Sequence, residues 1–247
     1  MDKKIYDFVV SIGEDCACTG YLRRHKLQEA SYPFDWLTFA PFENRIELIN
    51  NDFQNFLNFE DLEFLPKNPE KNNDAKCDYY KNKVTKFYFY HDFDAGKPLS
   101  ETFDKVREKY KRRIERFYRR IYMSESVLFV WLSRNKKISD DVLIKSYNTL
   151  KNKFKDKHID FLILENDSSE KHFRKSEISP NITKYIYDNA SYDFSNPLAE
   201  CMGNIEATDK LFSNITLKYT VKKRILKFFI NFIPVKRIRK ILRRDFL

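Results

Sequence analysis

The sequence predicts an α/β protein of three layers, in which a mostly parallel sheet has helices on both faces. A run of β-branched and aromatic residues at 5–11 leads directly into a helix-like segment. Two continuous apolar runs, at 127–132 and 159–164, flank an amphipathic segment that Ser139 caps. Strand, helix and strand in this order form a βαβ unit, which requires parallel pairing.

The start of the chain carries the main functional signal. The first strand ends in a turn, and a helix is expected over 15–26, because Glu14 and Asp15 suit the positive end of its dipole. Cys16 therefore lies in the opening turn of this helix. The dipole lowers the pKa of a thiol at this position, whereas the two neighbouring carboxylates raise it. Cys16 is the leading candidate nucleophile.

The other elements follow from apolar spacing and from turn residues. We expect a single globular α/β domain over residues 1–217 and a basic amphipathic tail over 218–247. Within the domain we expect one or two helices in 41–65, a polar surface loop over 66–83, a strand over 84–89, an amphipathic helix over 100–122, a strand over 183–187 and a closing helix over 196–213.

The positive charge is concentrated in the tail. Residues 218–247 hold eleven Lys or Arg and one acid, which accounts for the whole net charge of +10. The apolar run at 225–233 is too short to span a bilayer. A basic amphipathic segment of this kind binds an anionic membrane surface, although it could also be a helix packed on the domain. The residues expected at the membrane are Lys222, Lys223, Arg224, Phe228, Phe229, Phe232, Lys236, Arg237, Arg239 and Lys240.

The same features bear on location and partners. Four cysteines without paired spacing indicate neither a zinc site nor disulfides, and the start of the chain lacks a signal cleavage site. We therefore expect a cytoplasmic protein, peripheral on the inner face of the membrane. Phenylalanines in the tail suit a bilayer interface, so nucleic acid is not an expected partner.

Several polar residues follow predicted strands and could converge at the carboxyl edge of the sheet. Cys16 with His91 would supply a nucleophile and its base. A third group could orient the imidazole: Asp35, Asp92 and Asp188 are the candidates, and the sequence does not choose among them. The opposing interpretation is that Cys16 is a small core residue and His91 an ordinary strand-end histidine.

Two residues of the first turn have simpler roles. Ser11 could be a second nucleophile, but no G-x-S-x-G elbow surrounds it, so it more often satisfies turn amides. Gly13 is expected where other residues resist the backbone conformation. Amides near Cys16 could stabilise an oxyanion. Asp92 and Asp94 form a D-x-D pattern, which could hold a divalent metal in a sugar-nucleotide enzyme. We expect no cofactor or metal.

Three stretches, Ser11-Ile-Gly-Glu-Asp-Cys16, Leu22 to Leu27 and Ser31-Tyr-Pro-Phe-Asp-Trp36, resemble a bacterial family of unknown function labelled as papain-like cysteine peptidases. Looser similarity extends the resemblance to about residue 165. It implies that Cys16 is the nucleophile and His91 its partner, and it offers an α+β papain-like build as the alternative fold.

The sequence therefore favours a cysteine-dependent hydrolase or acyl-transfer enzyme at the cytoplasmic membrane surface, acting on a lipid-linked or glycan substrate in surface-glycan assembly. One alternative is a glycan-assembly transferase that uses a sugar-nucleotide or phosphate donor. Another is a membrane-surface binding module without enzymatic activity.

Overall fold

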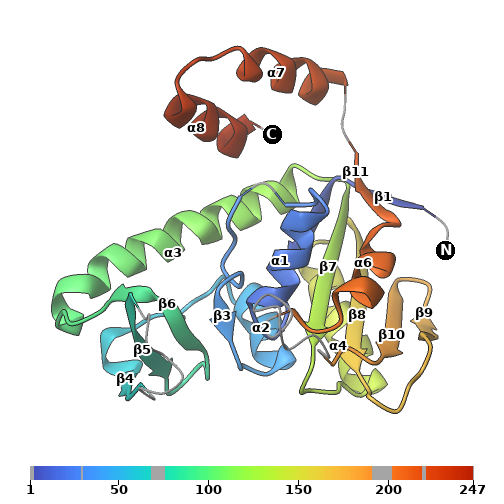
Figure 1. The fold of residues 1–247 in the computed structure, drawn as a ribbon, viewed down its shortest axis with the longest axis horizontal. Helices are drawn as coiled ribbons and strands as arrows, with labels where there is room; N and C mark the ends of the chain where they lie inside the picture. The colour runs from blue at the N-terminus through green and yellow to red at the C-terminus, as the bar shows by residue number, and fades with distance from the viewer. Residues whose placement is uncertain (1–2, 29, 68–75, 191–201, 219–220, 247) are drawn as a thin grey trace.

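The central sheet is mostly parallel, as the sequence predicts. A computed structural model describes residues 3–28, 30–67, 76–190, 202–218 and 221–246 (Figure 1). The first four strands of this sheet pair in parallel and in chain order, while the fifth is antiparallel at the far edge. In spatial order they are β2 (Phe8–Ser11), β7 (Ser126–Ser133), β8 (His158–Asn166), β10 (Ile182–Tyr187) and β9 (Arg174–Ser179).

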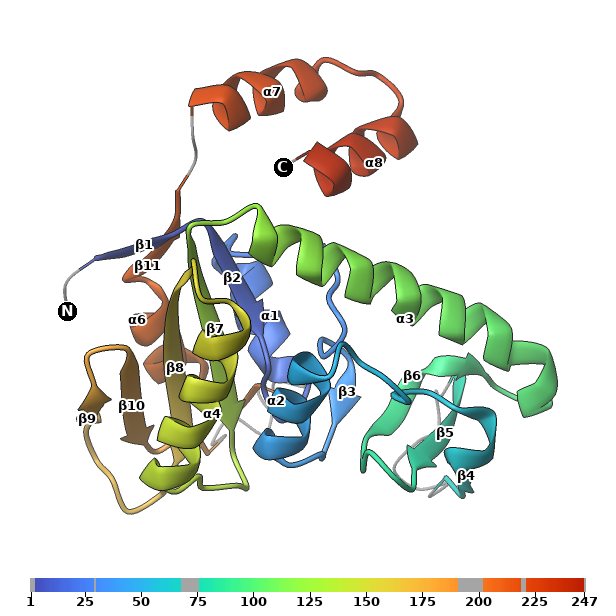
Figure 2. The same ribbon diagram turned by 180° about the vertical axis from the view of Figure 1, so that it is seen from behind.

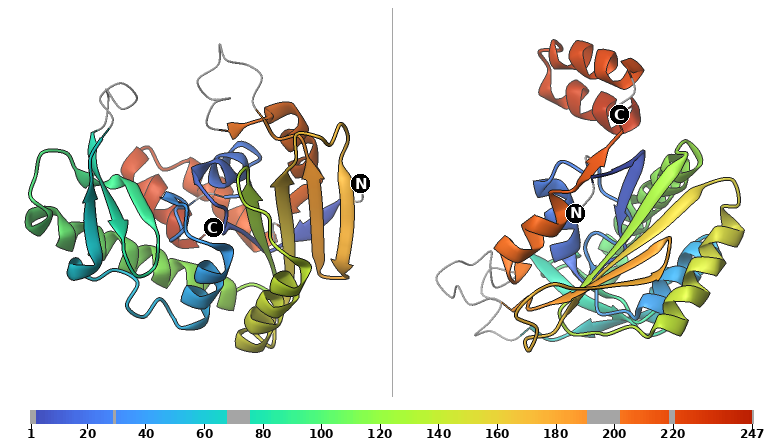
Figure 3. Two further views of the ribbon diagram at one scale, coloured as in Figure 1. Left: turned by 90° about the horizontal axis from the view of Figure 1, so that it is seen from below. Right: turned by 90° about the vertical axis from the view of Figure 1, so that its right-hand side faces the viewer.

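Helices cover both faces of this sheet, which confirms the predicted three layers. On one face lie α1 (Cys16–Arg24) and α6 (Ile205–Phe212), in front of the sheet in Figure 1. On the other face lie α2 (Phe42–Asn50) and α4 (Asp140–Lys153), in front in Figure 2. The side view in Figure 3 shows the layers edge-on. Each face has its own apolar cluster of buried side chains, because strands buried on both faces need a core on each side.

The βαβ unit and the long amphipathic helix form as expected. Ser139 Oγ accepts a hydrogen bond from the Val142 amide at 3.5 Å and caps α4, which connects the parallel strands β7 and β8. The second helix is α3 (Leu99–Tyr122). Its buried residues recur at helical spacing. One side of α3 therefore packs on the core, and the other side presents charged residues. The buried apolar residues are Phe103, Val106, Tyr110, Phe117 and Ile121.

A second, antiparallel sheet lies under the amino-terminal half of α3 and corrects three expectations. Its strands, in spatial order, are β3 (Leu37–Thr38), β6 (Tyr88–Asp94), β5 (Cys77–Asn82) and β4 (Leu62–Leu65). The predicted loop over 66–83 contains β5. The strand predicted at 84–89 is β6, which begins four residues later than expected. The end of the 41–65 segment, predicted as helical, forms a short 3-10 turn, Phe59–Asp61, and β4. Cross-strand aromatic pairs such as Tyr80 with Phe93, 4.7 Å between ring centroids, stabilise these strands despite their polar sequence.

The ends of the domain also differ from expectation. The strand predicted at 5–11 breaks at Asp7, because its carboxylate accepts hydrogen bonds from the amide and the hydroxyl of Ser126, at 3.0 and 2.9 Å. The first part, β1 (Lys4–Tyr6), pairs instead with β11 (Ile215–Leu217). The charged segment that forms β9 gave no strand signal. The closing helix expected over 196–213 is α6 in its second part, and residues 191–201 lie outside the described residues.

The tail forms two helices, α7 (Val221–Asn231) and α8 (Lys236–Phe246), which pack on each other beyond the central sheet (Figures 1 and 3). Within the described part of the chain, no helix combines the length and the apolar character that crossing a membrane requires.

The structure gives Gly13 a different role from the expected one. A Cβ atom on Gly13 would lie 2.4 Å from the Cβ atom of Cys18 in α1, so the glycine permits close packing of the turn on the helix. We predict that Gly13→Ala lowers the free energy of unfolding by about 1–3 kcal/mol, the usual range for overpacking, in urea denaturation.

Gly20→Ala is the matched control. Its Cβ would meet the Met202 side chain at an ordinary contact distance of 3.4 Å. Because Gly20 lies inside α1, alanine there should leave the free energy of unfolding unchanged or raise it by up to about 1 kcal/mol. Equal destabilisation by both substitutions would contradict the packing role of Gly13.

Candidate active site around Cys16

The turn between β2 and α1 is fixed by hydrogen bonds at each residue. Ser11 Oγ accepts from the Gly13 amide at 3.2 Å, which is the turn-satisfying role expected for this serine. The carbonyl oxygen of Glu14 accepts from the Phe39 amide at 3.1 Å and from Arg45 Nη2 at 3.0 Å. These bonds tie the turn that presents Cys16 to β3 and α2.

The two acids beside Cys16 are both engaged. The Glu14 side chain is only 2% exposed, and its Oε2 accepts from Ser133 Oγ at 2.6 Å. Asp15 is the N-cap of α1: its Oδ1 accepts from the Ala17 amide at 2.8 Å, and its Oδ2 forms an ion pair with Arg134 at 3.0 Å. Their negative charges are therefore directed to partners of their own, which weakens their opposition to a thiolate.

Arg45 is a functional candidate that sequence reasoning missed. It is fully buried, and its guanidinium packs against the rings of Phe34, Phe87 and Trp131, with its central carbon 5.4, 4.8 and 5.7 Å from the ring centroids. Burial lowers the pKa of Arg45 to about 9, while the nearby acids Asp15 and Glu14 oppose this shift. Its Nε and Nη1 atoms have no hydrogen-bond partner among the described residues. An arginine on a helix normally indicates a solvated face, so no sequence signal marked it.

The two cysteines of α1 differ sharply in environment. Cys16 is the first residue of the helix and is half-buried. Cys18 is fully buried, donates from its Sγ to the Val130 carbonyl oxygen at 3.4 Å, and has its pKa raised to about 12 by burial. Only Cys16 combines partial access with the positive end of a helix, the environment of reactive thiols.

The helix face that carries Cys16 packs against the 31–36 segment. Thr19 and Arg23 follow Cys16 at steps of three and four, so the three lie on one face. Thr19 Oγ1 donates to Asp35 Oδ1 at 3.1 Å, and the Arg23 guanidinium lies 5.3 Å from the Trp36 ring centroid. The motif that suggested a family resemblance therefore forms one wall of the site.

Asp35 holds this wall together. Its buried carboxylate also accepts from Gln28 Nε2 at 2.6 Å and from the Tyr32 amide at 2.9 Å. Burial raises the pKa of Asp35 to about 6, and the hydrogen bond from the Tyr32 amide and the charge of Arg23 oppose the shift. These contacts occupy both carboxylate oxygens, and the bond from Thr19 fixes the segment on α1.

His91 reaches the site through Trp36. It is an exposed residue of β6, at a register shift between β5 and β6, where a bulge redirects side chains. Its ring packs edge-to-face on Trp36 with centroids 5.6 Å apart, and desolvation lowers its pKa while Asp92 opposes. Within the described residues, neither Cys16 nor any carboxylate forms a hydrogen bond with the imidazole.

The other predicted acids lie elsewhere. Asp92 is a buried residue of β6. Its Oδ2 accepts from Tyr110 Oη at 2.8 Å, and its Oδ1 pairs with Lys109 Nζ at 2.6 Å. Asp94 pairs with Lys105 at 2.9 Å. Both carboxylates of the D-x-D pattern are thus held by lysines. No group of three or more metal-ligating side chains occurs in the part of the chain that the structure describes.

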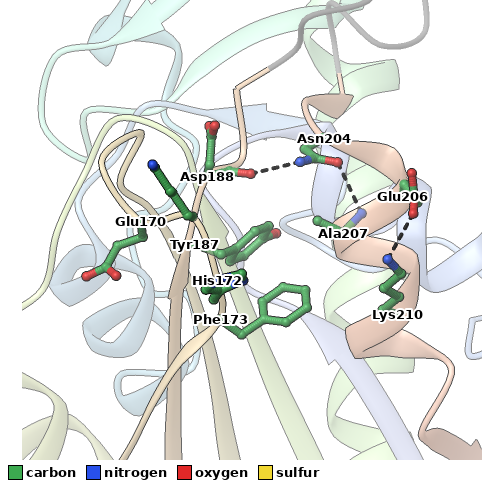
Figure 4. A pocket seen from close by; sticks show the side chains of 10 residues that line it. Glu170, His172, Phe173, Tyr187, Asp188, Asn204, Glu206, Ala207 and Lys210 are labelled. Atoms are coloured by element: carbon green, nitrogen blue, oxygen red, sulfur yellow. Dashed lines mark hydrogen bonds and ion pairs between the residues drawn. The ribbon is translucent and has the colours of Figure 1, made fainter.

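Asp188 lines a pocket of about 370 Å³ at the carboxyl end of β10 (Figure 4). Its backbone carbonyl accepts from Asn204 Nδ2 at 3.0 Å, and Asn204 Oδ1 in turn accepts from the Ala207 amide and caps α6. Glu206 and Lys210 form an ion pair at the rim. The pocket and Cys16 both follow carboxyl ends of parallel strands, the edge where α/β proteins place their sites.

Comparisons with known proteins identify a family. The sequence model of a family described as "Putative papain-like cysteine peptidase (DUF1796)" matches residues 7–165, which span β2, α1, the 31–36 segment, β6 and β8. The "Uncharacterized protein R408" of Acanthamoeba polyphaga mimivirus is 27% identical over 134 residues, which cover 49% of this chain and 59% of that viral protein. No solved structure matches the chain.

The contrast between the cysteines can be measured. We predict that iodoacetamide at near-neutral pH modifies Cys16 in the folded protein much faster than Cys77, whose pKa is raised by burial, and leaves Cys18 unmodified. Peptide mass spectrometry after timed quenching gives the rate at each site.

Denaturant supplies the control, because Cys18 should react once unfolding exposes it. A Cys16→Ser variant should lose the fast phase alone. Modification of Cys18 in the folded protein as fast as Cys16 would refute the described burial.

Proposed function

The chain belongs to the family described as "Putative papain-like cysteine peptidase", and on this premise we propose that it is a cysteine-dependent hydrolase or acyl-transfer enzyme. Cys16 is the nucleophile and His91 the general base and acid. The observation that carries the proposal is the position of Cys16: a partly exposed residue at the amino terminus of α1, shortly after a parallel strand, on a turn fixed by buried bonds.

The chemistry follows from this placement. His91 takes the thiol proton, and the Cys16 sulfur attacks a substrate carbonyl carbon to form a C–S bond. The oxyanion faces the first-turn amides of α1. The leaving group departs with the proton from His91, and a thioester remains. Water then cleaves the thioester to give a carboxylic acid, or another nucleophile accepts the acyl group.

In this proposal Trp36 controls how closely the Cys16 thiol and the His91 imidazole approach each other. The indole contacts both the His91 ring and the Arg23 guanidinium. Substrate binding brings Cys16 and His91 together, as catalytic hydrogen bonds often tighten only in the complex. Asp35 then acts as a positioning residue, because it holds the segment that carries Trp36.

Acylation by p-nitrophenyl acetate tests the nucleophile. We expect intact mass spectrometry to show one acetyl group per chain, located on Cys16 and absent from the Cys16→Ala variant. His91→Asn should slow acylation by about 100-fold, the lower end of a general base contribution.

The controls separate the named residues from their surroundings. His158→Asn removes an exposed histidine at the start of β8 and should leave the rate unchanged. Acetylation of the Cys16→Ala variant at the rate of the parent, or an undiminished rate in the His91 variant, would overturn the assignment.

We further propose that the tail holds the enzyme at an anionic membrane surface, close to lipid-linked substrates such as those of surface-glycan assembly. Three tail phenylalanines are well exposed: Phe228 at 59%, Phe229 at 63% and Phe232 at 70%. Lys236 and Arg237 are exposed and Arg239 is half-exposed, while the side chains of Lys222, Lys223, Arg224 and Lys240 lie outside the described residues. Exposed aromatics beside concentrated positive charge suit the headgroup level of a bilayer.

Liposome flotation tests the tail. Binding to phosphatidylglycerol vesicles should be strong at low salt, weaken as salt rises, and disappear on deletion of residues 221–247, because each basic residue contributes about 1 kcal/mol of attraction. Replacing Phe228, Phe229 and Phe232 with serine should also abolish binding.

The matched control replaces three apolar residues of the body that are equally exposed, Phe64, Val84 and Met123, with serine. This variant should bind like the parent. Binding that survives deletion of the tail would place the membrane contact elsewhere.

A further inference from the structure

A second pocket, of about 440 Å³, lies far from the Cys16 turn. It opens over the amino-terminal half of β7 and the first half and middle of β8, and it is also lined by β1, β9, β10, α6 and β11. Cys16 and the pocket at Asp188 follow the opposite, carboxyl ends of the strands. The two pockets therefore lie toward opposite edges of the sheet.

The floor of this pocket is apolar and belongs to the core. Its aliphatic residues are part of the cluster beneath α1 and α6, and each is less than 9% exposed to water. A ligand that entered would bury hydrocarbon against hydrocarbon, which is favourable because it removes apolar surface from water. These residues are Leu128, Leu162, Leu211 and Ile215.

The fully buried polar atoms of the pocket are paired within the protein. Tyr6 Oη donates to the carboxylate of Asp160 at 2.5 Å. No side chain that lines the pocket has a buried nitrogen or oxygen without a hydrogen-bond partner, as far as the described residues show. The hydroxyl groups of a sugar would lose their bonds to water against the aliphatic floor, whereas an alkyl chain has no such bonds to lose.

The mouth of the pocket is positively charged. Lys175 forms an ion pair with Glu177, and Lys4 has no ion-pair partner in the described part of the chain. Two lysines and one glutamate give the mouth a net charge of +1, and Lys4 on β1 is the lysine outside the ion pair. An anionic group on a bound chain would meet Lys4.

We propose that this pocket binds one acyl chain of an anionic amphiphile, with the hydrocarbon beneath α6 and the anionic head at Lys4. A free fatty acid and the acyl chain of a membrane lipid share this chemistry. The proposal does not depend on the activity of Cys16. The strand β11 lines the pocket through Ile215 and leads toward α7, so a lipid source at the tail would lie close by.

Titration of the full-length protein with 11-(dansylamino)undecanoic acid tests the site. We expect a saturable rise in fluorescence with one probe per chain. Lys4→Glu should weaken binding at least tenfold, because it reverses the charge at the mouth. Lys145→Glu reverses the charge of another exposed lysine, on α4 at the other face of the sheet, and should have no effect.

A substitution that fills the pocket with a larger side chain provides an independent test. Leu162→Trp should abolish binding while the protein remains folded by thermal unfolding, and if that variant does not fold, Lys4→Glu still decides. Displacement by palmitate or by lysophosphatidylglycerol supports the proposal, and the stronger competitor identifies the source as a free acid or a membrane lipid. Displacement by neither, or loss of binding only when Phe228, Phe229 and Phe232 are changed, would overturn it.

Discussion

The buried main chain of Glu14 is the constraint on which the candidate site depends. Its carbonyl oxygen accepts from both Phe39 and Arg45, and its side chain accepts from Ser133 at the end of β7. Three elements that are distant in sequence therefore meet at the residue before the cap of α1. Since the position of the Cys16 thiol follows from the start of that helix, the direction in which it points is set by this one residue.

Electrostatics at the same turn are balanced within a small volume. Two acids precede Cys16, and two arginines, one buried and one at the surface, lie next to them. Burial of the Arg45 guanidinium is unfavourable, and contacts with three aromatic rings and a hydrogen bond to the Glu14 carbonyl oxygen partly offset this. The two acids that precede α1 therefore both have positively charged neighbours.

Sequence patterns predicted those parts of the fold whose stability comes from apolar periodicity. The parallel strands β7 and β8, the capped helix between them and the long helix α3 are all found, because burial on both faces leaves a continuous apolar run. β5 and β9 were missed, since their stability comes from neighbouring strands. At the site, Cys16 and its helix were predicted, whereas Arg45 and the bridging role of Trp36 depend on contacts that no spacing reveals.

The pairing of β1 with β11 has a practical consequence for crystallisation. The Lys218 amide donates to the Tyr6 carbonyl oxygen at 2.7 Å, and its ammonium group lies 3.1 Å from Glu125. Lys218 adds to the positive charge of the tail, but its hydrogen bond and its ion pair are both with residues of the globular domain. A shortened chain cut immediately before this lysine would fray the amino-terminal strand, whereas one cut two residues after it would keep the ribbon intact.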